Sequence, residues 1–392
     1  MDRRTVLRVK VEDMSCDQER EGLSRRRFLQ GAAFTGASAM APMGSFAVKQ
    51  GGGHAVEPQS GLNGANLPNP IVKNFSGAYG DEPVPDFEAP KRAMGKTGVR
   101  ISILGMGGYH LGSSSGQEEA NNMVAKALDH GINFFDNAWD YHKGLSEERL
   151  GTALKGKRDR AVVMTKVCTH GRKKDVAMKM LEESLTRLQT DHLDVWQIHE
   201  VIYYDDPDRA YAADGVVEAL TAAKQQGKVR FVGFTGHKDP EIHLEMIKRG
   251  FPFDTVQFPV NPFDWNFRSF ERQVLPIAVE KGMAVFSMKS MSGSGEAISH
   301  GALTPTEALS YAMSVPGVST TISGMDSMGI LDQNLKILHG FQTLDEEAMG
   351  KLREHAKRLS DGRYELFKSS VKYDGDVGRE QHQFPLAAEL PA

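Results

Sequence analysis

The feature that most constrains the fold is a repeated alternation, from Lys91 onward, of short apolar runs with segments of helical periodicity. The runs predicted as strands are Ile101–Met106, Asn133–Asp136, Ala161–Lys166, Leu193–His199, Val229–Thr235, Thr255–Val260, Met283–Ser287 and Val318–Ser323. The helix-like segments are Glu118–His130, Glu147–Leu154, Asp175–Leu188, Gly215–Gln226, Pro240–Arg249, Phe270–Lys281, Pro305–Met313 and Ser327–His339. Such alternation indicates βαβ units with parallel strands. Eight units favour a closed barrel over an open sheet, so the predicted fold class is α/β, a (β/α)8 TIM barrel.

The ends of these elements are also legible in the sequence. Glycines follow four of the predicted helices, as residues that terminate helices in a left-handed conformation do: Gly131, Gly227, Gly250 and Gly282. The turn Gly95-Lys96-Thr97-Gly98 predicts an N-terminal hairpin that covers the bottom of the barrel. A further helix is expected over Asp345–Leu359. The barrel domain is therefore placed at residues 91–360, followed by a polar C-terminal tail, 361–392, with no clear pattern.

The N-terminus carries the pattern of an export signal. Ser24-Arg25-Arg26-Arg27-Phe28-Leu29-Gln30 precedes a weakly apolar run, Gly31 to Ala47, with small residues before possible cleavage points after Ala39 and Ala47. The paired arginines followed by Phe-Leu resemble the twin-arginine (Tat) signal, so residues 1–47 are predicted to direct the protein to the periplasm or outside the cell. The run is too polar for stable membrane insertion. The glycine- and proline-rich segment 48–90 is predicted to be an extended linker or arm.

Composition excludes several classes of function. The net charge is −4, with +2 in residues 1–47, so no basic surface favours nucleic acid. The two cysteines, Cys16 and Cys168, are too few for an all-cysteine iron–sulfur cluster. Cys168 is expected to be inert, and no metal-ligand motif is recognised. Oligomeric state cannot be read from the sequence.

The active site of a (β/α)8 barrel lies at the carboxyl ends of its strands, and three neighbouring strand ends carry reactive groups. Asp136 ends the second strand and Tyr141 lies on the loop beyond it, while Lys166 ends the third strand and His199 the fourth. A carbonyl that accepts hydride needs a proton donor at its oxygen. We expect the Lys166 ammonium to lower the pKa of the Tyr141 phenol toward the working range, Asp136 to balance that ammonium, and His199 to orient the carbonyl.

These residues resemble the motifs of the aldo-keto reductase family, over roughly Lys91 to Leu338. The matching pieces are Met94-Gly95-Lys96-Thr97-Gly98, Phe135-Asp136-Asn137-Ala138 with Tyr141, Ser146-Glu147-Glu148-Arg149-Leu150-Gly151, Thr165-Lys166, Ile198-His199, Val232-Gly233-Phe234-Thr235, Val256-Gln257-Phe258-Pro259-Val260-Asn261, Ser323-Gly324-Met325 and Gln333-Asn334-Leu335. By this resemblance Asp136, Tyr141, Lys166 and His199 form a catalytic tetrad, with Tyr141 as proton donor. The implied activity is NAD(P)(H)-dependent interconversion of an alcohol with an aldehyde, ketone or sugar carbonyl.

The resemblance also implies a nucleotide site at the barrel mouth, since no Gly-x-Gly-x-x-Gly motif follows a strand. Gln257 fits the position that binds the carboxamide, with Thr235 and Gly236 nearby and Asn261 beyond the strand end. Ser287 and Lys289 lie where the pyrophosphate passes. The adenosine would contact Ser323, Gly324, Asp326, Gln333 and Asn334.

Two departures from the family pattern bear on the choice of NAD or NADP. Ile330 stands where many members carry an arginine for the 2′-phosphate, and Gly324 stands where a cation often helps. Asp326 would instead accept hydrogen bonds from ribose hydroxyls. This favours NAD slightly, although Lys289 leaves NADP open.

The substrate remains open at this stage. Trp139 and Trp265 are candidates for aromatic walls of a substrate pocket, with core packing as the equal alternative. A non-catalytic nucleotide-binding barrel is the main competing function, and a Schiff-base lyase using Lys166 is another. An exported protein meets little free dinucleotide, so we expect a cofactor that exchanges slowly.

Overall fold

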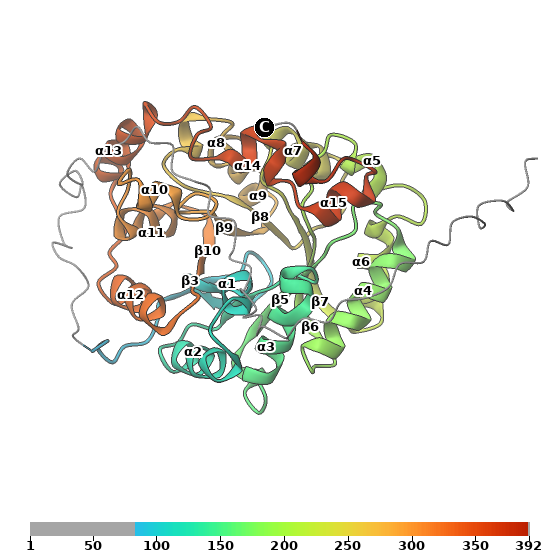
Figure 1. The fold of residues 1–392 in the computed structure, drawn as a ribbon, viewed down its shortest axis with the longest axis horizontal. Helices are drawn as coiled ribbons and strands as arrows, with labels where there is room; N and C mark the ends of the chain where they lie inside the picture. Colours follow the sequence, from blue (N-terminus) through green and yellow to red (C-terminus); the bar gives the residue numbers. More distant parts are fainter. Residues whose placement is uncertain (1–82, 391–392) are drawn as a thin grey trace, which may run out of the picture. The chain divides into compact units, whose positions relative to one another are not determined.

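Eight parallel strands close into a barrel in the computed structural model, which describes residues 83–390 (Figure 1). The strands are β3 (Leu104–Gly107), β4 (Phe134–Asp136), β5 (Val162–Val167), β6 (Leu193–Ile198), β7 (Val229–Thr235), β8 (Thr255–Pro259), β9 (Ala284–Met288) and β10 (Val318–Gly324), with β10 pairing back to β3. The predicted (β/α)8 barrel is therefore confirmed. The predicted signal, residues 1–47, and all but the last residues of the predicted linker lie outside the described residues.

The strands read as continuous apolar runs because both of their faces are covered. Every residue of β4, β5, β6 and β8 is buried, as expected for parallel strands with helices on one side and a filled barrel on the other. The larger hydrophobic cluster fills the layer between strands and helices, and a smaller one fills the barrel interior. Because apolar side chains fill both faces of the strands, the polar residues that could form a site lie at the carboxyl ends of the strands, at the barrel mouth.

The helices surround the barrel, as Figure 1 shows. Those anticipated from the sequence are α2 (Gln117–Asp129), α3 (Leu145–Ala153), α4 (Lys174–Arg187), α6 (Val216–Gln225), α7 (Pro240–Lys248), α8 (Phe270–Gln273) with α9 (Leu275–Glu280), α11 (Pro305–Ser314), α12 (Met328–His339) and α13 (Glu346–Lys357). Three short helices were not anticipated: α1 (Gly108–Gly112), α5 (Asp206–Ala210) and α10 (Glu296–Ser299). No helix in residues 83–390 combines the length and apolar character that crossing a membrane requires.

The predicted N-terminal hairpin is present. Strands β1 (Lys91–Ala93) and β2 (Arg100–Ser102) pair antiparallel, and Gly95 and Gly98 adopt positive φ angles of 54° and 81° in the turn. Met94 and Ile101 are fully buried in the cluster that fills the barrel interior, so the hairpin closes the barrel floor. The predicted strand Ile101–Met106 is thus two strands, one in the hairpin and one in the barrel.

The C-terminal segment is more ordered than the expected patternless tail. It forms α14 (Leu366–Ser369), α15 (Asp376–Gln381) and the 3-10 turns Val371–Tyr373 and Ala387–Glu389, which lie beside α5 and α7 in Figure 1. Lys368 anchors the segment, since its fully buried ammonium pairs with Asp264 at 2.6 Å and Glu365 at 2.9 Å. A second ion pair joins Lys238 to Asp374. The segment thereby packs on the loops that follow β6, β7 and β8.

Candidate active site

The structure brings the four predicted catalytic residues together at the barrel mouth. Asp136 ends β4, Lys166 lies in β5, His199 directly follows β6, and Tyr141 opens a 3-10 turn, Tyr141–Gly144. The Lys166 ammonium contacts the Asp136 carboxylate and lies 2.7 Å from the Asn137 carbonyl oxygen and 3.3 Å from the Tyr141 hydroxyl oxygen. The Lys166 and Asp136 side chains are only 1% and 6% exposed, so this ion pair is screened little by solvent.

Two local backbone features put Tyr141 in reach of Lys166. His142 and Lys143 adopt positive φ angles of 50° and 57°, which turns the chain sharply after the tyrosine. Gly108 lets α1 approach the end of β4, because a Cβ there would fall 2.3 Å from the Asp136 carbonyl oxygen. Gly108 is therefore required by the close packing of α1 on the end of β4.

His199 is oriented by a carboxylate that the sequence analysis did not identify. Its Nδ1 lies 3.1 Å from Oδ1 of Asp140, and its ring packs edge-on against Tyr141 with the ring centroids 5.6 Å apart. A carboxylate only accepts hydrogen bonds, so Nδ1 donates in this contact and Nε2 is left for a ligand. The sequence feature that could have identified Asp140 is its position directly before Tyr141.

The expected lowering of the Tyr141 pKa is wrong. Burial, followed by the charges of Asp136, Asp140 and Glu200, raises the pKa of Tyr141 well above its usual value. The physical reason is that Asp136 neutralises the Lys166 ammonium, while burial disfavours the phenolate. Burial likewise raises the pKa of Asp136 against the opposing effect of Lys166. Tyr141 therefore keeps its proton, as a proton donor must before the reaction.

Several residues predicted to hold the nucleotide carry buried polar atoms that are ready for a ligand. Within residues 83–390, Oε1 of Gln257 and Oδ1 of Asn334 are buried and accept no hydrogen bond. Ser323 fixes the Asn334 side chain by accepting from its Nδ2 at 3.0 Å. Lys289, with a positive φ of 57°, is half-buried, and its ammonium lies 4.8 Å from the centroid of the Phe367 ring and forms no ion pair with another described residue. An amide acceptor and an unpaired cation suit a carboxamide and a pyrophosphate, so these residues fit a nicotinamide dinucleotide.

Other predicted nucleotide residues have structural contacts. Thr235 ends β7, and a Cβ on the adjacent Gly236 would fall 2.2 Å from the Val201 carbonyl oxygen. The Ser287 hydroxyl donates to Thr321 at 2.9 Å. Asn261 accepts from the backbone N–H groups of Phe263 and Asp264 at 2.9 Å, so its side chain braces the loop after β8.

The segment predicted to face the adenosine follows β10. A Cβ on Gly324 would fall 2.2 Å from Nδ1 of His110, so a side chain there would require the His110 ring to move. Asp326 interacts electrostatically with His110. Gln333 and Asn334 lie in α12, where the predicted arginine position, Ile330, is 37% exposed.

Comparison with known proteins decides the family. The model of the aldo/keto reductase family matches residues 103–297. The Bacillus subtilis oxidoreductase YrpG is 31% identical over 239 residues, which cover 54% of this chain and 71% of YrpG. The chain belongs to the aldo/keto reductase family. It is an NAD(P)(H)-dependent oxidoreductase that interconverts a carbonyl compound and an alcohol.

Further relatives of this aldo/keto reductase agree. L-galactose dehydrogenase of Arabidopsis thaliana is 28% identical over 299 residues, covering 67% of this chain and 92% of that enzyme. An aldo-keto reductase from Pseudomonas aeruginosa is 28% identical with a TM-score of 0.54, covering 65% of this chain and 96% of its own. An aldo-keto reductase from Bacillus halodurans in its holo form shares the fold, with a TM-score of 0.59 at 24% identity over 71% of this chain and 99% of its own.

The two tryptophans proposed as substrate walls contact other parts of this aldo/keto reductase. Nε1 of Trp139 donates to Glu183 of α4 at 2.8 Å, and its ring lies against Arg187. The ring of Trp265 is covered by the Arg353 guanidinium, 3.7 Å from its centroid. These contacts are with helices that surround the barrel, so the structure gives the substrate-wall prediction no support.

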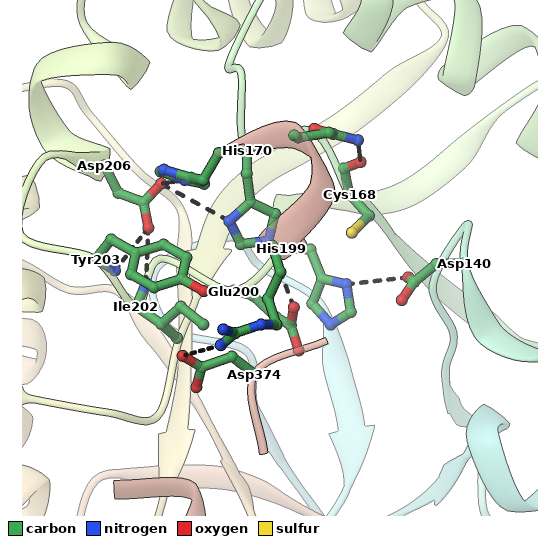
Figure 2. Close-up of polar contacts among 12 residues, drawn as sticks. Asp140, Cys168, His170, His199, Glu200, Ile202, Tyr203, Asp206 and Asp374 are labelled. Atoms are coloured by element: carbon green, nitrogen blue, oxygen red, sulfur yellow. Dashed lines mark hydrogen bonds and ion pairs between the residues drawn. The ribbon is translucent and has the colours of Figure 1, made fainter. Parts of the chain in front are cut away.

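A second polar cluster, which the sequence analysis did not anticipate, adjoins the tetrad (Figure 2). Three groups of residues place potential ligand atoms within 4.8 Å of one another: Asp140, Cys168 and His199; Cys168, His170 and Glu200; and His170, Asp206 and His382. Cys168 and His170 follow β5, Glu200 follows β6, and His382 comes from the C-terminal segment. Only folding brings these residues together, which is why no motif announced them.

Proposed function

We propose that this aldo/keto reductase reduces the carbonyl group of a small molecule with NADH, with Tyr141 as the proton donor. The observation that carries the proposal is the Lys166 ammonium, which contacts Asp136 and reaches the Tyr141 hydroxyl at 3.3 Å in a buried setting. When bound, the dinucleotide supplies the hydride. The side chains of the tetrad supply the proton for the substrate oxygen and the group that orients it.

The tetrad divides this work among its members. A carbonyl that gains hydride develops negative charge on its oxygen, and the resulting alkoxide is a stronger base than a phenolate. Tyr141 transfers its proton to that oxygen, and the phenolate left behind is stabilised by the neighbouring ammonium of Lys166. Asp136 keeps Lys166 charged and in place. His199, held at Nδ1 by Asp140, presents Nε2 to the substrate oxygen.

Residues of the neighbouring strands orient the nucleotide. Gln257 offers its free Oε1 to the carboxamide. The half-buried ammonium of Lys289, which forms no ion pair with another described residue, attracts the pyrophosphate. The burial of Asp136, Lys166 and His199 excludes water from the reacting atoms and strengthens their electrostatic effects.

The preference for NADH is supported by the absence of cationic side chains where a 2′-phosphate would need them. No Lys or Arg occurs from Gly324 to Asn334, and Asp326 would repel a phosphate while accepting from ribose hydroxyls. Ile330→Arg restores the missing guanidinium at an exposed position. We expect it to raise kcat/KM for NADPH about tenfold, since one charge-assisted hydrogen bond contributes roughly 1.5 kcal/mol. An unchanged ratio of NADPH to NADH activity would contradict this assignment.

The overall proposal is tested with the protein lacking residues 1–47. NADH and NADPH oxidation is measured against a panel of sugars, aldehydes and ketones, together with nucleotide binding. Turnover of at least one carbonyl compound with NADH preferred supports the proposal. Nucleotide binding without turnover of any compound argues instead for a barrel that binds the cofactor without catalysis.

We also propose that the enzyme is exported through the twin-arginine machinery and carries its cofactor with it. The order of arginines, apolar run and small residues in residues 1–47 supports export. Because that route carries folded proteins, a slowly exchanging nucleotide would be loaded before export. Cell fractionation of the wild type and the Arg25→Lys/Arg26→Lys variant tests export. Retention of the wild type in the cytoplasm would contradict export. Purification of the exported protein free of nucleotide would contradict the loading of the cofactor before export.

A further inference from the structure

The cluster beside the tetrad contains an unusually placed carboxylate. Glu200 makes no ion pair with a Lys or Arg among the described residues, and its ion-pair contact is His170, with 3.4 Å between Oε2 and Nε2. Its side chain is only 16% exposed, and it adopts a positive φ of 49°. Strained backbone at a residue other than glycine is typical of functional sites. The Glu200 carboxylate is therefore oriented by an imidazole and is available as a ligand on the side that faces His170.

His170 is the second member of this group. Its side chain is fully buried, and neither ring nitrogen makes a hydrogen bond within the described part of the chain. Both ring nitrogens are therefore available to a ligand. While Nε2 faces Glu200, Nδ1 faces Asp206 at 3.9 Å.

Cys168 completes the group. Its side chain is fully buried and its sulfur lies within 4.8 Å of the ligand atoms of His170 and Glu200.

The distances match a small tetrahedral ion. Nitrogen and oxygen ligands about 2.0–2.2 Å from such an ion lie roughly 3.3–3.6 Å from each other. The 3.4 Å between His170 and Glu200 falls in this range, and the sulfur needs to approach them by no more than about 1.3 Å to join them. A donor set of thiolate, imidazole and carboxylate suits zinc and its neighbours rather than calcium or magnesium.

The other two groups are less suited to a cation. Oδ1 of Asp206 is occupied by the Arg172 guanidinium at 2.8 Å, and Oδ2 accepts from the backbone N–H groups of Ile202 and Tyr203. In the remaining group, Nδ1 of His199 already contacts Asp140. Figure 2 shows these contacts of Asp206, and it also shows the contact of His199 with Asp140.

We propose that Cys168, His170 and Glu200 form a binding site for a divalent transition-metal ion of the zinc class, with a fourth coordination position left open. The thiol of Cys168 loses its proton to solvent as the sulfur–metal bond forms, so binding strengthens with rising pH. Because Cys168 is also a neighbour of Asp140 and His199, the bound ion lies beside the tetrad.

Cobalt(II) titration of the full chain tests the proposal, because a cobalt–thiolate bond gives a charge-transfer absorption. A Cys16→Ser background leaves Cys168 as the single thiol. We expect one equivalent of cobalt to produce the band and zinc to displace it. Cys168→Ser should abolish the band, and Glu200→Gln should weaken zinc binding by more than about tenfold.

Two matched variants separate the three groups. His382→Gln and Asp140→Asn change only the alternatives, so both should bind cobalt as the background protein does. Thermal unfolding of each variant checks that it is folded. If Cys168→Ser does not fold, zinc binding by Glu200→Gln provides the test. Absence of stoichiometric binding, a band that survives Cys168→Ser, zinc binding unchanged in Glu200→Gln, or equal loss in His382→Gln or Asp140→Asn would overturn the proposal.

Discussion

Replacing Lys166 by methionine separates the structural and catalytic effects of the buried ion pair. Methionine keeps much of the side-chain volume but removes the ammonium, which contacts Asp136, the Asn137 carbonyl oxygen at 2.7 Å and the Tyr141 hydroxyl at 3.3 Å. Asp136, with a side chain only 6% exposed, is left without its cation. Removing one partner of a buried pair costs about 3–5 kcal/mol. For a domain of this size we expect the Tm to fall by roughly 6–10 °C.

The loss depends on pH in a defined direction. Burial already raises the folded-state pKa of Asp136, and Lys166 opposes that effect. Without Lys166 the folded-state pKa rises further. A raised carboxyl pKa contributes stability that is fully present below the unfolded value and is lost as pH rises through the folded value. The stability difference between wild type and Lys166→Met should therefore be smallest in acid, below about pH 4, and grow toward neutral pH.

The assay is thermal unfolding across that pH range, with Asp136→Asn/Lys166→Met as the matched control. The double variant removes both charges of this ion pair and strands neither, so it should regain most of the lost stability at neutral pH. Its reductase activity should remain at least about a hundredfold below wild type, since Tyr141 has lost its stabilising cation. The reasoning is refuted if Lys166→Met is as stable as the wild type at neutral pH, or if the double variant recovers activity.

Two further predictions concern buried charges outside the tetrad. Burial raises the pKa of Glu271 to about 7, although Tyr311 donates to it at 2.8 Å, so its contribution to stability is full below pH 4.5 and is lost as pH rises through about 7. Unfolding at pH 5 and pH 8 should therefore show a weaker pH dependence in Glu271→Gln than in the wild type, and identical slopes would contradict the assignment. Lys368→Met should cost about 3–5 kcal/mol, because it strands Asp264 and Glu365. Limited proteolysis should then cleave residues 361–390 faster, and an unchanged cleavage pattern would show that Lys368 does not anchor the C-terminal segment.

The sequence predicted the barrel well because its physical signals are local. Strands covered on both faces are continuous apolar runs, and the longer helices repeat their apolar residues often enough to show a period. Helices as short as α1, α5 and α10 contain too few residues to show one. The C-terminal segment is held by isolated contacts, such as the ion pair of Lys368 with Asp264 and the buried ring of Phe367, which leave no periodic apolar pattern in the sequence.

The candidate site was predictable where it follows strand order. Asp136, Lys166 and His199 stand at successive strand ends, and the barrel rule places such residues together. The raised pKa of Tyr141 was not predictable, because the sequence shows the nearby lysine but not the depth of burial. The group of Cys168, His170 and Glu200 was missed for a similar reason, since its members lie on two loops that only the closed barrel brings together.

The most direct test of the central claim compares Tyr141→Phe with the wild type in NADH-dependent carbonyl reduction, with nucleotide affinity measured in parallel. Phenylalanine retains the ring that packs against His199 and removes only the hydroxyl. We predict that kcat falls by about 10²–10⁴-fold while nucleotide affinity stays unchanged. A Tyr141→Phe variant that turns over at the wild-type rate would show that Tyr141 is not the proton donor.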